Sequence, residues 1–288
     1  MTINVKNLVQ NRIAAQQQIG AIINELNAGP LSKYQAMDFS DIEEAYDSIE
    51  KYVVGTANGI YRSFVVSGPA GVGKTSAVTR MLDQHAPGRY KVVAGHMTLI
   101  QLYGELYQHR SQGEIVVLDD IDSVFSKVEG VNLLKAATDS IQQRRISYAT
   151  SSHLLQAWGI PKTFDYNGGI IVISNETQRR RNGGKLGQHI SAVTDRMYVL
   201  SLGSNDKNEQ YHQLCYQVIH HGLLSNRGLN PDQERKVLDY IGLNLDRLKR
   251  ISLRTATKLA DLVISEPNNW REMAKIGVLD CVDAMGGE

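Results

Sequence analysis

Apolar and polar residues alternate along the chain in patterns that change twice. From Val5 to Leu26 the apolar residues recur at roughly helical spacing, and Gly29-Pro30 ends this run. We therefore expect an N-terminal helical arm over residues 1–33. It contains no cluster of residues suited to catalysis, so it is expected to act as a packing helix or a protein-contact arm.

From residue 34 the pattern becomes one of short apolar runs that alternate with amphipathic segments. The runs predict strands at Ser63–Ser67, Tyr90–Ala94, Glu114–Leu118, Gly169–Ser174 and Met197–Leu202. The segments predict helices at Asp41–Val54, Thr75–Leu82, Leu99–His109, Val131–Gln142 and part of Ser151–Trp158. Strands that are apolar throughout are typical of a parallel sheet covered on both faces. We expect an α/β core over residues 34–203, with a parallel sheet sandwiched by helices.

After Gly203 the sequence shows no strand pattern. Asn230-Pro231 is a typical helix start, with an N-capping side chain followed by proline at the first helical position. Two apolar stripes follow, one formed by Leu238, Ile241, Leu245, Leu248 and Ile251, the other by Ala256, Leu259, Ala260 and Val263. Residues 204–288 are therefore expected to form a helical domain.

Composition narrows the possible environments and partners. The 288 residues carry a net charge of +1, so any contact with nucleic acid would need a local basic patch. The two cysteines, Cys215 and Cys281, form no metal-ligand pattern and favour a reducing compartment. The apolar runs are too short to span a bilayer. We expect a cytoplasmic protein with no membrane partner.

A phosphate-binding loop connects the first strand to the following helix. It matches the Walker A pattern with Gly68, Pro69, Ala70, Gly71, Val72, Gly73, Lys74 and Thr75, and Ser76 continues into the helix. Glycines allow successive backbone N–H groups to point at phosphate oxygens, and the helix N-terminus adds a partial positive charge. Lys74 is expected at the β- and γ-phosphates, and the Thr75 hydroxyl at Mg²⁺. The predicted cofactors are therefore ATP and Mg²⁺.

An acidic pair follows the strand Glu114–Leu118. Asp119 stands at the carboxyl end of this buried-type strand, where a parallel sheet binds its ligands, so we assign it to Mg²⁺. Asp120 would then orient or deprotonate the attacking water. The alternative is a solvated acidic turn after a core strand.

With these motifs in place, the chain resembles the AAA+ ATPases from about Tyr34 to Ala260. The resemblance implies three further roles. Asn175 corresponds to the sensor-1 asparagine that helps to hold the attacking water, and Arg196 to the arginine finger that enters a neighbouring subunit. Arg254 lies in the sensor-2 region of the helical lid and would face the γ-phosphate. Ordinary ion pairs remain alternatives for both arginines, on the surface for Arg196 and with Asp261 for Arg254.

Two details refine the resemblance. Most AAA+ proteins have glutamate where this chain has Asp120, which is one methylene shorter and suggests slow hydrolysis or action through a second water. The segment Phe164–Gly169 leading into Ile173-Ser174-Asn175 resembles phage-encoded AAA+ ATPases. The resemblance therefore implies a homo-oligomer, as a hexamer-like ring or a helical filament, in bacterial or phage-infected host cytoplasm.

Basic residues gather in two further places. Arg144 and Arg145 follow a predicted helix, and a glycine-containing loop carries Arg179, Arg180, Arg181 and Lys185. They would contact phosphates of DNA or RNA, or else form solvated loops or inter-subunit ion pairs. No helix-turn-helix or zinc-finger pattern accompanies them, which argues against sequence-specific recognition.

The leading functional hypothesis is an oligomeric ATPase that remodels nucleic acid or nucleoprotein in phage replication or recombination, with DNA or a DNA-bound protein as partner. A protein-remodelling AAA+ ATPase and a slowly hydrolysing, ATP-dependent assembly scaffold remain alternatives. A small-molecule kinase is disfavoured, because it needs neither a helical lid nor the set Asn175, Arg196 and Arg254.

Overall fold

The computed structural model describes residues 29–121, 124, 127–141, 143–149, 153–175 and 191–279. The chain divides into two compact units. Residues 40–209 form one, here called the sheet unit, and residues up to 39 together with those from 210 form the other, the helical unit. The arm expected before residue 29 lies outside the described residues, and the domain boundaries at 33 and 203 stay predictions.

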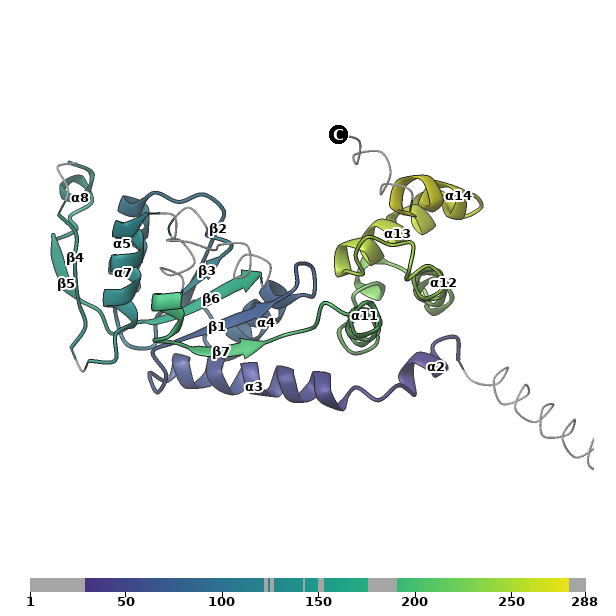
Figure 1. The fold of residues 1–288 in the computed structure, drawn as a ribbon, viewed down its shortest axis with the longest axis horizontal. Helices are drawn as coiled ribbons and strands as arrows, with labels where there is room; N and C mark the ends of the chain where they lie inside the picture. The colour runs from purple at the N-terminus through teal and green to yellow at the C-terminus, as the bar shows by residue number, and fades with distance from the viewer. Residues whose placement is uncertain are drawn as a thin grey trace, which may run out of the picture. The chain divides into compact units, whose positions relative to one another are not determined.

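The sheet unit is built on five parallel strands in the order β2-β3-β6-β1-β7 (Figure 1). They are β1 (Ser63–Gly68), β2 (Tyr90–Ala94), β3 (Ile115–Asp119), β6 (Gly169–Asn175) and β7 (Tyr198–Ser201). All five predicted strands are present, with ends that shift by one residue at most. The α/β fold with a parallel core sheet is therefore confirmed.

Both faces of the central strands β1, β3 and β6 are covered, which explains why these strands are apolar along most of their length. Helices α5 (Leu99–Gln108) and α7 (Val128–Thr138) contribute to a core cluster with Val65, Val116 and Val172 of the strands. Neighbouring strand residues such as Val66 and Val117 point to the opposite face, where α3 (Ser40–Ala57) and α4 (Lys74–His85) pack. The central strands therefore lose the period-two polarity of a half-exposed sheet.

A short antiparallel hairpin was not predicted from the sequence. Strands β4 (Arg145–Ser147) and β5 (Thr163–Asp165) pair with Ile146 opposite Phe164, and both of these side chains are buried. The predicted helix Val131–Gln142 was too long, because α7 ends at Thr138 and the chain turns toward β4. Three-residue strands are too short to display a recognisable period. A short helix, α8 (Leu154–Ala157), lies between β4 and β5.

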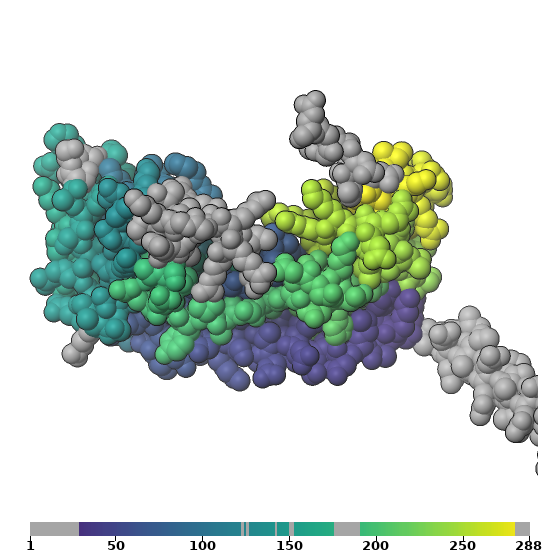
Figure 2. Space-filling view, viewed as in Figure 1, coloured from purple at the N-terminus to yellow at the C-terminus, as the bar shows by residue number. Residues whose placement is uncertain are grey.

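One edge of the sheet is open to solvent. β7 pairs with β1 on one side only, and its residues Tyr198 and Val199 are exposed. The space-filling view shows this strand (green) at the surface beside α3 (Figure 2). The ring of Tyr198 is tilted against that of Tyr52 and meets that of Tyr61 edge-on, so the edge carries a small aromatic cluster.

The helical unit contains no strand among its described residues, as the sequence predicts. Its helices are α2 (Ser32–Gln35), α11 (Lys207–His221, which starts in the sheet unit), α12 (Pro231–Gly242), α13 (Leu253–Ser265) and α14 (Trp270–Ala274), with a 3₁₀ turn at Ser225–Arg227 and a π-helical turn at Lys275–Leu279.

The predicted start of α12 is confirmed by a capping box between Asn230 and Gln233. The first apolar stripe does not belong to a single helix. Helix α12 ends at Gly242, and Leu248 and Ile251 are buried residues of the loop that follows it. Across the described helices, none has the length and apolar character needed to cross a membrane.

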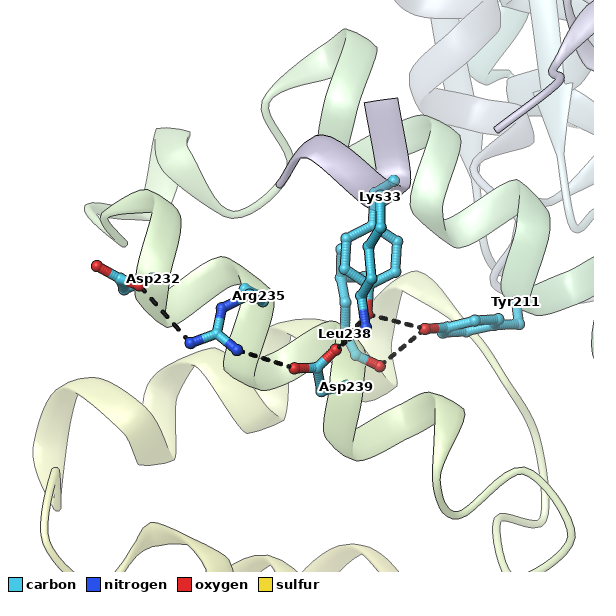
Figure 3. Close-up of polar contacts among 7 residues, drawn as sticks. Lys33, Tyr211, Asp232, Arg235, Leu238 and Asp239 are labelled. Atoms are coloured by element: carbon cyan, nitrogen blue, oxygen red, sulfur yellow. Dashed lines mark hydrogen bonds and ion pairs between the residues drawn. The ribbon is translucent and has the colours of Figure 1, made fainter. Parts of the chain in front are cut away.

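A polar cluster ties the N-terminal segment to α11 and α12 within the helical unit (Figure 3). Asp239 accepts hydrogen bonds from Lys33 Nζ at 2.6 Å and from the Tyr34 hydroxyl at 2.7 Å. The Tyr211 hydroxyl donates to the Leu238 carbonyl at 3.0 Å and lies 3.3 Å from the Tyr34 hydroxyl. Residues some 200 positions apart are thereby joined through one carboxylate.

The pKa values in this cluster follow from its contacts. Partial burial alone would raise the pKa of Asp239, but the hydrogen bonds from Lys33 and Tyr34 outweigh it and hold that pKa below its ordinary value. Burial, together with hydrogen bonds to Tyr211 and Asp239, raises the pKa of Tyr34 far above its ordinary value. The cluster is therefore most stable with Asp239 ionised and Tyr34 neutral.

We expect Asp239→Asn to destabilise the helical unit by about 1–2 kcal/mol at neutral pH, because it replaces a charge-assisted pair of hydrogen bonds. A depressed carboxyl pKa contributes stability that is present above its unfolded value and disappears as the pH falls through its folded value. The difference between the two proteins should therefore begin to shrink as the pH falls below about 4 and vanish only below the depressed folded pKa. Hydrogen exchange of the α12 amides, measured at both pH values, checks this.

The matched control is Asp232→Asn, which removes only a weak 3.7 Å ion pair with Arg235 at the exposed end of the same cluster. It should change stability by less than about 0.5 kcal/mol. Equal losses in the two variants would show that Asp239 has no special role in joining these segments.

Candidate functional site

The loop between β1 and α4 has the backbone that a phosphate cradle requires. Gly71 and Gly73 have φ values of 85° and 96°, a region that residues with a Cβ rarely adopt. A Cβ on Gly68 would lie 2.0 Å from the Leu202 carbonyl oxygen, so only glycine fits where β7 ends beside the loop. The Leu202 N–H also donates to the Ser67 carbonyl at 2.8 Å, which fixes this approach.

Lys74 is held inside the loop. Its side chain is only 5% exposed, and Nζ donates to the carbonyls of Gly68 at 3.0 Å and Pro69 at 2.8 Å. A third bond, 2.8 Å long, runs from Nζ to Oδ1 of Asn175 at the end of β6. A buried amino group with three oxygen acceptors is fixed in place beside the cradle.

Thr75 and Asp119 form a hydrogen-bonded pair beside Lys74. The Thr75 hydroxyl donates to Asp119 Oδ2 at 2.8 Å, joining the first turn of α4 to the end of β3. These oxygens fit Mg²⁺, which takes one or two protein ligands and completes its octahedron with phosphate oxygens and water. No group of three His, Cys, Asp or Glu side chains suited to a metal occurs elsewhere in the described ranges. Ser76 is exposed in the same first turn of α4.

Asp120 and Asn175 are brought together at the same edge. Asn175 Nδ2 donates to Asp120 Oδ1 at 2.8 Å, so the amide bridges Lys74 and Asp120. Asp120 is exposed and has φ of 50°, a left-handed conformation that costs free energy in a non-glycine residue. This turn places a solvent-accessible carboxylate beside the site, immediately after Asp119.

Arg196 lies at the opposite edge of the same sheet. It precedes β7 by two residues, and β7 runs parallel to β1, whose other end leads into the phosphate loop. With six residues, β1 spans ~20 Å, so Arg196 is remote from the loop of its own chain. Its side chain is exposed, donates to the Ala192 carbonyl and lines a cavity of about 430 Å³ together with Arg62, a residue that the sequence analysis did not single out.

The remaining candidates have different surroundings. Arg254 is exposed in the first turn of α13, in the helical unit, and its sensor-2 role stays a prediction. The alternative ion pair between Arg254 and Asp261 is not formed, because Asp261 pairs with Arg227 at 2.7 Å.

The structure describes only one of the two predicted groups of basic residues, Arg144 and Arg145. Arg144 was expected to reach nucleic acid, but it is buried and donates to the carbonyls of Ala137 and Gly168. It therefore offers nothing to an extended phosphate backbone. Arg145 is exposed and pairs with Asp165 at 3.0 Å. Arg179, Arg180, Arg181 and Lys185 lie outside the described residues, so their contact with nucleic acid stays a prediction.

A relative in a bacterial virus shares most of this sequence. The chain is 31% identical over 257 residues to an uncharacterized 36.7 kDa protein encoded in the nrdC-mobD intergenic region of Enterobacteria phage T4, and the match covers 84% of this chain and 79% of the relative. The chain belongs to the family of this phage T4 protein. Searched against protein-family models, the sequence matches none.

Several solved structures share features of the fold at low sequence identity. The replication initiator DnaA bound to AMPPCP and single-stranded DNA is 13% identical, with a TM-score of 0.45. The Holliday junction branch migration motor RuvB of Thermotoga maritima is also 13% identical, with a TM-score of 0.46. The matches cover 79% and 83% of this chain, but only 63% of that DnaA and 64% of that RuvB. No functional assignment rests on these likenesses.

We expect Lys74→Ala to weaken binding of a fluorescent ATP analogue by at least about tenfold, since a buried ammonium that contacts phosphate is lost. Lys91→Ala is the matched control, because Lys91 is an exposed lysine on β2 of the same unit and should leave affinity unchanged. Titration by fluorescence anisotropy measures both. Affinity within threefold of the wild type for Lys74→Ala would contradict the phosphate cradle.

Proposed function

We propose that this protein binds ATP with Mg²⁺ and hydrolyses it as an oligomeric AAA+ ATPase. The observation that carries the proposal is the chain of hydrogen bonds from Lys74 through Asn175 to Asp120, next to the pair formed by Thr75 and Asp119. Five side chains from two strand ends, those of β3 and β6, and from the start of α4 thus face a single glycine-rich loop. This combination has no evident use in packing alone, because Asp120 is exposed and its backbone is strained.

Each group has a defined part in the proposed reaction. Lys74 and the loop N–H groups would bind the β- and γ-phosphates, and Thr75 with Asp119 would hold Mg²⁺, which neutralises charge on the phosphates. Asp120 would orient a water for attack on the γ-phosphorus and accept its proton. Asn175 fixes the Asp120 carboxylate and leaves its second oxygen for that water. The fixed position offsets part of the shorter reach of aspartate.

The position of Arg196 supports action between protomers. Its guanidinium lies at the amino edge of the sheet, whereas the phosphate loop lies at the carboxyl edge, so it would serve the site of a neighbour. A homo-oligomer, ring or filament, would join the two edges of successive subunits. An arginine supplied in this way stabilises transition-state charge.

We further propose that the oligomer acts on DNA or a DNA-bound protein in the bacterial or phage-infected cytoplasm. Support comes from the phage T4 relative and from the basic sequence between Arg179 and Lys185. An ATP-dependent assembly scaffold that hydrolyses slowly is the second candidate, favoured by aspartate at position 120. ATPase rates measured with and without single-stranded DNA, duplex DNA or unfolded protein distinguish these possibilities.

Asp120→Asn should leave ATP affinity within about threefold of the wild type and lower the hydrolysis rate by at least about a hundredfold, because it removes the base and keeps the shape. Asp120→Glu should hydrolyse at the wild-type rate or faster. Single-turnover phosphate release measures both variants. Asp47→Asn, an exposed change on α3, is the control. Normal turnover by Asp120→Asn would place the catalytic carboxylate elsewhere.

Arg196→Ala should keep ATP affinity and lose turnover by about 10³-fold or more. Mixing it with Lys74→Ala should restore part of the activity, since the Lys74→Ala protomer supplies Arg196 to an intact loop next to it. Turnover per site should also rise with protein concentration. A fully active monomer, or mixed oligomers without activity, would contradict a role in trans.

A further inference from the structure

A second, smaller cavity lies at the amino edge of the sheet, away from the phosphate loop. It encloses about 160 Å³, and its walls include Thr56, Tyr61, Arg62, Gln112, Arg144 and Asn167. Two of these side chains carry a positive charge. Over the described ranges of the chain, no carboxylate lines the cavity, so its electrostatic potential is set by the two arginines.

Arg144 is a buried cation for which the described part of the chain provides no counter-ion. Its side chain is 4% exposed and donates to the carbonyls of Ala137 at 2.6 Å and Gly168 at 2.9 Å. Its guanidinium also lies 5.0 Å from the ring centre of Tyr166. Carbonyl dipoles compensate only part of the cost of burying a full charge, which proteins normally meet with a carboxylate or a bound anion.

Arg62 brings a second guanidinium to the same wall. It donates to the carbonyls of Asp139, at 3.0 Å, and Ile141, and it forms no ion pair with a described residue. Burial lowers the pKa of Arg144, and the nearby charge of Arg62 lowers it further. Two cations that repel each other across one cavity are stabilised by an anion between them.

Thr56 adds an unused hydrogen-bonding group. This residue of α3 lines the cavity and is 1% exposed, and its hydroxyl has no hydrogen-bond partner among the described residues. A buried hydroxyl without a partner costs free energy, which a ligand oxygen would recover. The methyl side of Thr56 faces Gly169, where a Cβ would lie 2.4 Å from it, so the β6 backbone packs tightly behind the cavity.

We propose that this cavity is a binding site for a phosphate-sized oxyanion, held by Arg62, Arg144 and Thr56. A water molecule occupies about 30 Å³ of the liquid, so the cavity has room for one phosphate group. Guanidinium groups match the paired oxygens of phosphate, and the uncharged walls of Gln112 and Asn167 add amide donors. The ligand is inorganic phosphate or the phosphate of a small monoester.

The test uses the full chain carrying Lys74→Ala, so that phosphate is not bound at the Walker A loop. Thermal unfolding is followed during titration with inorganic phosphate and, at equal ionic strength, with chloride. Phosphate should raise the melting temperature with a Kd on the order of 1 mM, and Arg62→Gln should weaken that binding at least about tenfold. Lys91→Gln, which removes a positive charge elsewhere in the unit, should leave it unchanged.

Thr56→Val is a second variant, which tests the site even if the substitution of an arginine disturbs folding. In chloride this variant should be as stable as the parent or more so, because an unpaired buried hydroxyl is removed. In phosphate it should gain less stability than the parent. The proposal would be overturned if phosphate stabilised Thr56→Val and Arg62→Gln as much as it stabilises the parent. It would also be overturned if phosphate had no greater effect than chloride on the parent.

Two further titrations identify the source of the anion. Glycerol phosphate that binds as tightly as inorganic phosphate indicates a monoester ligand, and tighter binding of inorganic phosphate indicates the free ion. Acetate should bind at least about tenfold more weakly than phosphate, since it offers two oxygens and a single charge. Acetate and phosphate affinities that are equal would show a nonspecific response to negative charge and refute the assignment.

Discussion

The hydrogen-bonded register of β6 between β1 and β3 is the constraint on which the candidate site depends. It places Gly68 opposite Asn175 and Asp119 opposite Ile173, so β1 and β6 end at one level and β3 ends two residues earlier, directly before Asp120. The polar side chains therefore meet at the edge where the chain leaves the sheet. A shift of one residue in this register would turn Asn175 away from Lys74 and separate Asp120 from its partner. Because buried apolar residues on both faces fix the register, the precision of the site is set by the core.

The parts of the structure that the sequence predicted are those with a local signature. The glycine pattern around Lys74 specifies backbone geometry directly, and apolar runs of five or six residues indicate buried parallel strands. The capping box at Asn230 is a similarly local signal. The β4–β5 hairpin has none, because it depends on Ile146 and Phe164 meeting from distant positions in the chain. The end of α7 at Thr138 could not be predicted for the same reason, because it is set by the turn toward β4.

Contacts between distant residues also account for what the sequence could not show about the site. The residue types at Lys74, Asp120 and Asn175 were recognisable, but the hydrogen bonds that join them arise only when the sheet closes. Arg144 illustrates the opposite case. Beside Arg145 it resembled a surface patch, yet its position before β4 directs it inward to the carbonyls of Ala137 and Gly168. A charged pair in sequence therefore became one surface residue and one buried residue.

Strand β7 has a mechanical consequence that follows from its two ends. Arg196 precedes its first residue, and the carbonyl of Leu202, just after its last, leaves no room for even a methyl group on Gly68. Four residues of extended, hydrogen-bonded chain between these points behave as a stiff rod, because stretching or compressing a paired strand breaks its ladder. If a neighbouring subunit contacts Arg196 as proposed, a displacement at that end would be carried along β7 to the glycine-rich loop. The two ends of one short strand would thereby couple a subunit contact to the loop where phosphate would bind.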